Sequence, residues 1–150
     1  MNEHQKDRFV KTMVRTMFNT LAGKRIAVLG FAFKPGTSDT RDSPALAVCK
    51  LLLDEHARLA ISDPRALENA REDLKGRAEC SFTADPYEAA RGAHAIALLT
   101  AWPEYRDLDF RRVFEAMEKP AFLFDGWNFL DHAALTKIGF NVYRVGAGTD

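Results

Sequence analysis

The sequence predicts a doubly wound α/β domain with a mainly parallel, Rossmann-like sheet, preceded by one amphipathic helix. Short apolar runs alternate with helical segments of roughly ten residues, which is typical of strands joined by crossover helices. Several helical segments begin with a polar residue followed by proline, a common helix start. With 150 residues, 47% of them hydrophobic, the chain is long enough for one core.

The chain opens with a helical pattern over residues 2–21. Phe9, Met13 and Met17 recur every fourth residue on one face, and the other face is charged. We expect this apolar stripe to pack either against the sheet or against a helix of a partner. Because the pattern begins directly after Met1, we also expect the chain to be part of a longer protein.

The first half of the domain reads as strand, helix, strand, helix. Ser43-Pro44 and Asp63-Pro64 are predicted helix starts, in which the polar side chain caps the free N–H groups. The expected elements are a buried strand over 24–33, a loop over 34–42, a helix over 43–56, a strand over 58–62 and a helix over 63–74.

The second half continues the alternation. Asp85-Pro86 repeats the helix start, and the apolar run over 93–100 is its clearest buried strand. The expected elements are a weak strand over 78–82, helices over 85–91, 109–117 and 132–137, strands over 93–100, 121–124 and 141–145, and a frayed tail over 146–150.

Composition excludes several classes of function. Lys+Arg and Asp+Glu both number 21, so no net positive field attracts nucleic acid or an anionic membrane. The longest apolar runs fall short of the roughly 20 residues that cross a bilayer, and the polar start is unlike a signal peptide. We therefore expect a cytoplasmic protein without nucleic-acid or membrane partners.

The loop after the first strand is a candidate anion site. Lys34 and Arg41 lie between that strand and the helix start at Ser43. In a parallel sheet, ligands bind beyond the carboxyl ends of the strands, so backbone N–H groups, the helix dipole and these cations are placed to bind a diphosphate. The loop matches neither the G-x-G-x-x-G nor the Walker pattern. The alternative is a solvated turn with a helix cap.

Other polar and aromatic residues follow strands and so face the same edge. Asp63 is expected to be a helix cap, with a ribose contact as the alternative. Trp102 and Tyr105 are equally suited to stack on a base or to cover the core.

Neither the cysteines nor the histidines predict a catalytic or metal centre. Cys49 lies among apolar residues, which indicates a buried structural thiol, and Cys80 has no nearby histidine or basic helix start to activate it. His56 falls where a helix ends, and histidine tolerates the left-handed conformation needed there. The remaining histidines, which lack metal-ligand spacing, are His4, His94 and His132.

A longer motif identifies a family. The run LGFAFKPGTSDTRDSP over 29–44 closely resembles the opening of the C-terminal, UDP-binding domain of the UDP-glucose/GDP-mannose dehydrogenase family, in its UDP-glucose 6-dehydrogenase branch. The resemblance covers almost the whole chain. It continues through Asp63-Pro64, Asp85-Pro86-Tyr87-Glu88-Ala89, Gly92-Ala93-His94-Ala95, Thr100-Ala101-Trp102 and Phe124-Asp125-Gly126.

The resemblance implies a part of an NAD-dependent oxidoreductase that converts UDP-glucose to UDP-glucuronate. In the family, upstream domains bind NAD and supply the catalytic cysteine, so this chain is expected to hold no catalytic residue and to be inactive alone. Residues 1–22 resemble the end of a central helix between domains, and residues 23–150 the UDP-binding domain. A homo-oligomer formed through the N-terminal helix is expected.

The resemblance also assigns residues. Phe33 and Lys34 occupy positions that contact UDP, and Arg41 occupies one that reaches the NAD cofactor. Trp127 departs from the family pattern, which usually has a substrate-holding arginine after Asp-Gly; it is expected to stack on uracil or to fill a subunit contact. Two alternatives stay open: an assembly module with a vestigial nucleotide site, and a domain for GDP-mannose or another nucleotide sugar.

Overall fold

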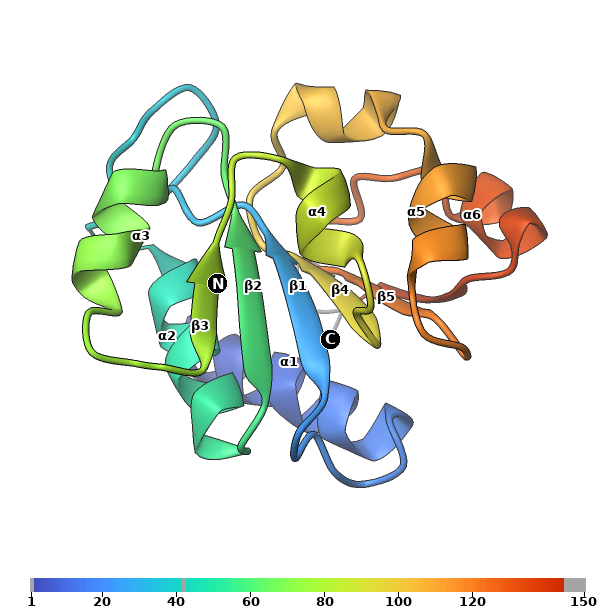
Figure 1. Ribbon diagram of the computed structural model, residues 1–150, viewed down its shortest axis with the longest axis horizontal. Coiled ribbons are helices and arrows are strands. Elements are labelled where there is room, and N and C mark those ends of the chain that lie inside the picture. The colour runs from blue at the N-terminus through green and yellow to red at the C-terminus, as the bar shows by residue number, and fades with distance from the viewer. Residues whose placement is uncertain (1, 42, 145–150) are drawn as a thin grey trace.

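Six parallel strands form one sheet in the order β3-β2-β1-β4-β5-β6 (Figure 1). The computed structural model describes residues 2–41 and 43–144. Starting from β1, the chain first builds the sheet toward β3 and then crosses to β4 and builds toward β6. This is the strand order of the doubly wound nucleotide-binding folds, and it confirms the predicted fold class.

The elements alternate as expected along the chain. The strands are β1 (Arg25–Leu29), β2 (Arg58–Ser62), β3 (Cys80–Phe82), β4 (Ala95–Leu98), β5 (Phe122–Asp125) and β6 (Asn141–Arg144). The helices are α1 (Glu3–Thr16), α2 (Pro44–Asp54), α3 (Leu67–Asp73), α4 (Pro86–Ala90), α5 (Phe110–Ala116) and α6 (His132–Ile138). A 3-10 helix, η1 (Pro103–Asp107), was not predicted from the sequence.

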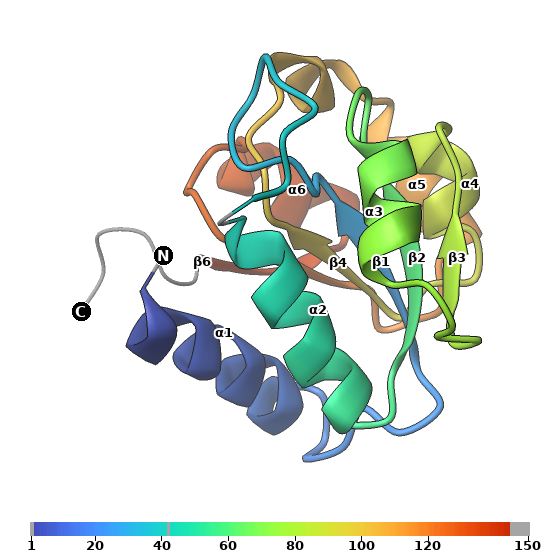
Figure 2. The same ribbon diagram turned by 90° about the vertical axis from the view of Figure 1, so that its left-hand side faces the viewer.

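Helices cover both faces of the sheet (Figure 2). One face and the helices α1, α2 and α3 enclose the first hydrophobic cluster, in which Phe124, Ile61 and Met13 are buried. The other face packs against α4, η1, α5 and α6 and includes Leu123 and Tyr105. Every residue of β4 and β5 is buried, because both of their faces are covered.

The predicted first strand was too long, since β1 ends at Leu29 rather than at residue 33. Gly30 has φ +95°, and a Cβ atom there would lie 2.5 Å from Thr100 Cβ and 2.6 Å from Thr100 N. Only glycine permits this conformation and this approach without strain. The loops after β1 and β4 therefore touch directly beyond the ends of their strands.

Helix starts were predicted well at two of three Pro-containing sites. Ser43 and Asp85 accept hydrogen bonds from the N–H groups of Ala45 and Tyr87 and so cap α2 and α4. The third prediction was wrong, because α3 begins at Leu67 and its N-cap residue, Ala66, has no side-chain cap. At the end of α2, His56 adopts φ +67°, as expected.

The apolar stripe of α1 packs against the chain's own sheet and α2. Phe9, Met13 and Met17 are at most 1% exposed, and the Phe9 ring lies 6.5 Å from that of Phe124. α1 runs beside α2 on the same face of the sheet (Figure 2). Of the two expected packing partners for the stripe, the structure therefore shows the sheet.

Among the described residues, no helix has both the length and the apolar character needed to span a bilayer. The predicted end of the last strand at residue 145 and the tail over 146–150 lie outside the described residues.

Candidate functional site

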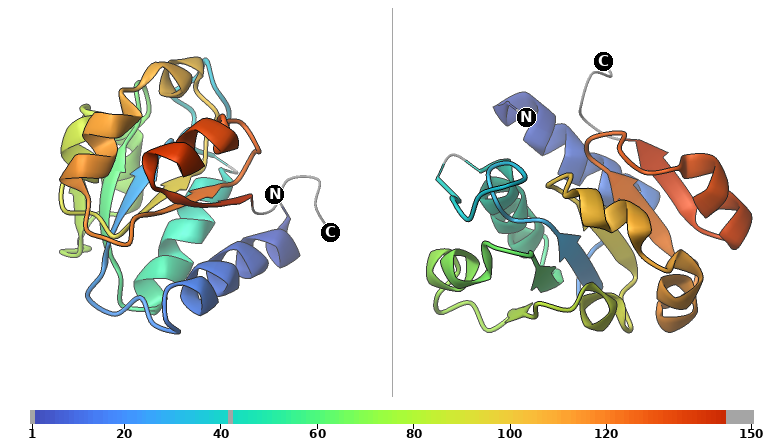
Figure 3. Two further views of the ribbon diagram at one scale, coloured as in Figure 1. Left: turned by 90° about the vertical axis from the view of Figure 1, so that its right-hand side faces the viewer. Right: turned by 90° about the horizontal axis from the view of Figure 1, so that it is seen from above.

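A pocket opens at the carboxyl edge of the sheet, where β1, β4 and β5 end. This edge is at the top of Figure 1 and faces the viewer in the right-hand view of Figure 3. The pocket has a volume of about 210 Å³ and is lined by Phe33, Lys34, Pro35, Thr100, Ala101 and Trp127. The chain leaves β1 and β4 in opposite directions, so this is the switch point at which doubly wound folds bind ligands.

Phe33 and Lys34 come from the loop after β1. The Phe33 N–H donates to the carbonyl of Asp39 at 2.7 Å, which closes the loop on itself. The Phe33 side chain is 44% exposed, and Lys34 is exposed beside it. Lys34 is the one cation among the residues that line this pocket.

Trp127 lines the same pocket from the turn after β5. Its indole Nε1–H donates to the Leu99 carbonyl at 2.8 Å, and its backbone N–H donates to Asp125 Oδ1 at 3.0 Å. These two bonds fix the ring, while 39% of the side chain stays exposed. The pocket is therefore lined by a fixed aromatic ring and by one cationic side chain.

Asp125 holds the turn that carries Trp127. Its carboxylate is fully buried, and Oδ2 accepts from the N–H groups of Phe129 and Leu130 at 2.7 and 2.8 Å. His132 Nε2 lies 2.8 Å from the same oxygen and acts as a further donor to the carboxylate. No role was predicted for Asp125 or His132 from the sequence, in which the Asp-Gly pair directly after a strand was the available signal.

Asp63 links the segments after β1, β2 and β4 through hydrogen bonds. This carboxylate is 1% exposed; Oδ2 accepts from Phe31 N, Ala32 N and Trp102 Nε1 at 2.7, 3.0 and 3.0 Å. Oδ1 accepts from Arg65 N and Ala66 N, inside a turn that precedes α3. Asp63 does not cap α3 as expected, because the N-cap residue of that helix is Ala66. The alternative, a ribose contact, does not fit either, because the side chain is buried and both carboxylate oxygens already accept hydrogen bonds from the chain.

Arg41 does not line the pocket. Its guanidinium forms an ion pair with Asp39 at 2.9 Å, and the same aspartate accepts from the Arg41 backbone N–H at 2.8 Å. These bonds from Arg41 lower the pKa of Asp39. The structure thus brings Phe33, Lys34 and Trp127 together and leaves Arg41 on the outer part of its loop.

Trp102 and Tyr105 cover the core rather than face a ligand. They are 5% and 2% exposed, and the Tyr105 hydroxyl donates to the Ser62 carbonyl at 3.4 Å. Burial, with smaller contributions from the charges of Asp63 and Glu104, raises the pKa of Tyr105. Of the two alternatives stated for this pair, the structure shows the core-covering one.

The residues present do not fit NAD held in the usual way. In dinucleotide folds, N–H groups after the first strand bind the pyrophosphate. Here the N–H groups of Phe31 and Ala32 donate to Asp63, and that of Ala45 donates to the Ser43 side chain. The N–H groups of Phe31, Ala32 and Ala45 are therefore already bonded within the chain, and Lys34 is the charged group that lines the pocket at this edge.

The thiols are not poised for nucleophilic chemistry. Cys49 is fully buried, and burial raises its pKa. Burial also raises the pKa of Cys80 to about 11, so this thiol is protonated at neutral pH. Within residues 2–41 and 43–144, no three His, Cys, Asp or Glu side chains cluster to hold a metal ion.

Residues 27–132 match the profile of the UDP-glucose/GDP-mannose dehydrogenase family, UDP binding domain. The chain belongs to this family. The matched residues run from within β1 to the start of α6, and therefore include both the loop of Phe33 and Lys34 and the turn of Trp127.

Proteins of the UDP-glucose dehydrogenase type are similar over nearly the whole chain. UDP-glucose 6-dehydrogenase 2 of Oryza sativa subsp. japonica is 46% identical over 169 residues, covering 100% of this chain and 35% of the relative. UDP-glucose 6-dehydrogenase of Drosophila melanogaster is 45% identical over 157 residues, covering 97% of this chain and 33% of the relative. The chain thus spans about a third of the length of these relatives.

Solved structures agree on the fold. A UDP-glucose dehydrogenase from Pyrobaculum islandicum superimposes with a TM-score of 0.78 at 29% identity, over 95% of this chain and 29% of that chain. A GDP-mannose dehydrogenase from Pseudomonas aeruginosa gives a TM-score of 0.58 at 21% identity, over 86% of this chain and 28% of that one. The second likeness concerns the fold alone.

Proposed function

We propose that this chain is the UDP-binding part of a UDP-glucose 6-dehydrogenase and holds the UDP end of the substrate in the pocket of Phe33, Lys34 and Trp127. The observation that carries the proposal is the meeting of one cation and two exposed aromatic rings at the switch point, in a chain of this family. Lys34 is suited to the diphosphate, and the Trp127 indole offers a flat surface for uracil.

The volume of the pocket agrees with a site that holds only the UDP end of the substrate. Its volume of about 210 Å³ is below the roughly 300–1,000 Å³ of sites that enclose a whole small ligand. It accommodates a ring system and leaves the sugar outside, where further parts of a longer protein would perform the oxidation with NAD. Holding a remote, unreactive group still raises the rate, because it positions the reacting one.

Three further assignments belong to this proposal. Arg41 contacts the NAD cofactor when the longer protein closes over the domain, which requires that its pairing with Asp39 be exchanged. Residues 1–22 are the end of a central helix, and the whole protein is a cytoplasmic homo-oligomer. Since the apolar stripe of α1 is buried within the chain, any contact between subunits through α1 uses its polar face.

Lys34→Ala is expected to weaken UDP binding about ten- to a hundredfold, because a charge-assisted contact contributes about 1.5–3 kcal/mol. Isothermal titration calorimetry of the chain with UDP measures this change. Binding of uridine, which has no phosphate, should change little. Lys50→Ala, an exposed lysine on α2, is the matched control. Undiminished UDP binding by the Lys34 variant would remove Lys34 from the site, and tighter binding of GDP than UDP would assign the domain to a GDP-sugar.

The chain alone is expected to form no NADH from UDP-glucose and NAD. Its two cysteines have raised pKa values, and the N–H groups that would bind a dinucleotide are bonded to Asp63. Absorbance at the nicotinamide band provides the readout, with a full-length relative as the positive control. Turnover by the isolated chain would contradict the proposed division of labour.

A further inference from the structure

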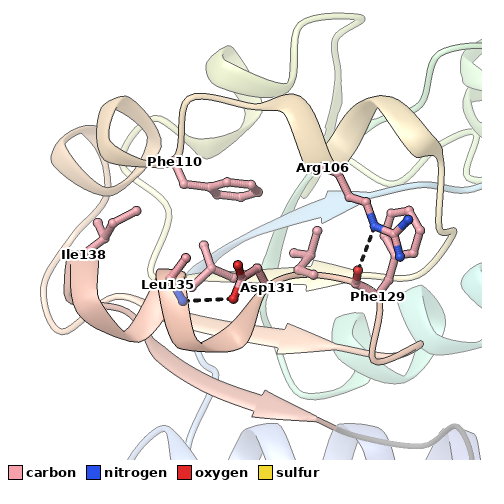
Figure 4. A pocket seen from close by; sticks show the side chains of 8 residues that line it. Arg106, Phe110, Phe129, Asp131, Leu135 and Ile138 are labelled. Atoms are coloured by element: carbon pink, nitrogen blue, oxygen red, sulfur yellow. Dashed lines mark hydrogen bonds between the residues drawn. The ribbon is translucent and has the colours of Figure 1, made fainter.

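A second pocket, with a volume of about 430 Å³, lies between η1, α5 and α6 (Figure 4). It shares no lining residue with the candidate nucleotide pocket. Its volume falls within the range of about 300–1,000 Å³ that is typical of small-molecule sites. The lining residues are Arg106, Phe110, Phe129, Leu130, Asp131, Ala134, Leu135 and Ile138.

The walls of this pocket are mostly apolar, and several of the lining residues also pack in the hydrophobic core. Leu130 and Leu135 are 8% and 2% exposed and belong to the core. The Phe110 ring packs edge-on against Phe140, with centroids 6.2 Å apart, and projects over the pocket from α5. Such a surface favours a flat or branched apolar group.

Arg106 adds a fixed cation at one end. Its Nε–H donates to the Phe129 carbonyl at 3.0 Å, and its guanidinium carbon lies 3.8 Å from the centroid of the Phe129 ring. Over the part of the chain that the structure describes, no hydrogen bond or ion pair involves the two Nη groups. A stacked guanidinium with both Nη groups available matches the geometry of a carboxylate.

Asp131 provides the opposite charge in the same pocket. Its Oδ1 accepts from Ala134 N at 3.1 Å and caps α6. The carboxylate side chain is drawn between Phe110 and α6 in Figure 4, so a bound anion would be repelled by it. Its removal should therefore affect an anion and a neutral ligand differently.

We propose that this pocket binds a small amphipathic carboxylate, with an aromatic or branched apolar body against Phe110, Leu135 and Ile138 and its carboxylate on the Nη groups of Arg106. The site is separate from the proposed UDP pocket and does not depend on it. The ligand class follows from the combination of an apolar cavity of small-molecule size and one stacked, partly unbonded guanidinium.

The test uses two probes of equal shape, 2-naphthoate and the uncharged 2-naphthalenemethanol. Each is titrated into the chain, with NMR of the Leu135 and Ile138 methyl groups to locate binding and to give the dissociation constant. We expect saturable shifts with 2-naphthoate. Arg106→Gln should weaken this binding roughly ten- to a hundredfold and leave the alcohol unchanged. Arg111→Gln, on the exposed face of α5 and outside the pocket, is the matched control.

Two further variants make the result decisive. Asp131→Asn keeps an equally good N-cap and should strengthen 2-naphthoate binding severalfold while leaving the alcohol unchanged. Ala134→Leu enlarges a side chain that lines the pocket and should weaken binding of both probes severalfold. The proposal is overturned if the methyl groups show no saturable shifts, or if either Arg106→Gln or Ala134→Leu binds 2-naphthoate as well as the original chain does. Lys34→Ala should leave 2-naphthoate binding unchanged, so failure here and failure of the UDP proposal are distinguishable.

Discussion

Asp63→Ala is expected to lower the free energy of unfolding by about 3–5 kcal/mol, one of the largest effects of any single change in this chain. The substitution leaves four backbone N–H groups and the Trp102 indole without the acceptor they share in the buried interior. Buried donors without partners cost about 1–3 kcal/mol each, and partial entry of water reduces the sum. Urea denaturation followed by circular dichroism measures the difference.

The matched control is Asp107→Ala, at an exposed position in η1, which should change stability by less than about 0.5 kcal/mol. At temperatures where the Asp63 variant stays folded, it should also bind UDP more weakly, because the loop of Phe33 and Lys34 loses its attachment through Phe31 and Ala32. A loss of stability below about 1 kcal/mol would show that these donors find other acceptors.

Met13→Gln is expected to destabilise the chain by about 3–5 kcal/mol. Glutamine has nearly the same length and helix propensity as methionine, so the change chiefly places an amide where the side chain is 0% exposed. The loss combines about 1.5–3 kcal/mol of apolar burial with about 1–3 kcal/mol for an amide without partners. Thermal unfolding of the variant and of Lys11→Gln, on the exposed face of α1, gives the comparison.

The same variant separates two roles of α1. If the stripe packs inside the chain, the loss of stability is the same at every protein concentration, and sedimentation shows no change in assembly. If Met13 instead joined two copies, the variant would dissociate a dimer, and the midpoint would depend on concentration. That second outcome would contradict the packing of α1 described above.

Patterns within short segments made most of the elements predictable. The buried strands are continuous apolar runs, and Ser43 and Asp85 cap helices through N–H groups two residues further on. The end of β1 was missed because the close approach of Gly30 to Thr100 joins distant segments. The η1 helix follows Trp102, whose indole is fixed by Asp63 from 39 residues away.

The candidate site was only partly predictable, because some of its contacts follow from local patterns and others join distant segments. Phe33, Lys34 and Trp127 each follow a strand, and the carboxyl ends of parallel strands meet at one edge. The role of Asp63 depends on donors 31 to 39 residues distant, which no local pattern specifies. Arg41 pairs with Asp39, two residues before it, and its contact with the NAD cofactor stays a prediction.

The turn held by Asp125 contributes different residues to the two pockets. Trp127 faces the smaller cavity, and Phe129 and Leu130 face the larger one, yet all three donate backbone N–H groups to one carboxylate. Ligands bound at the two proposed sites would therefore contact opposite ends of one short segment. If one ligand changes the affinity of the chain for the other by some factor, the second must change the affinity for the first by the same factor.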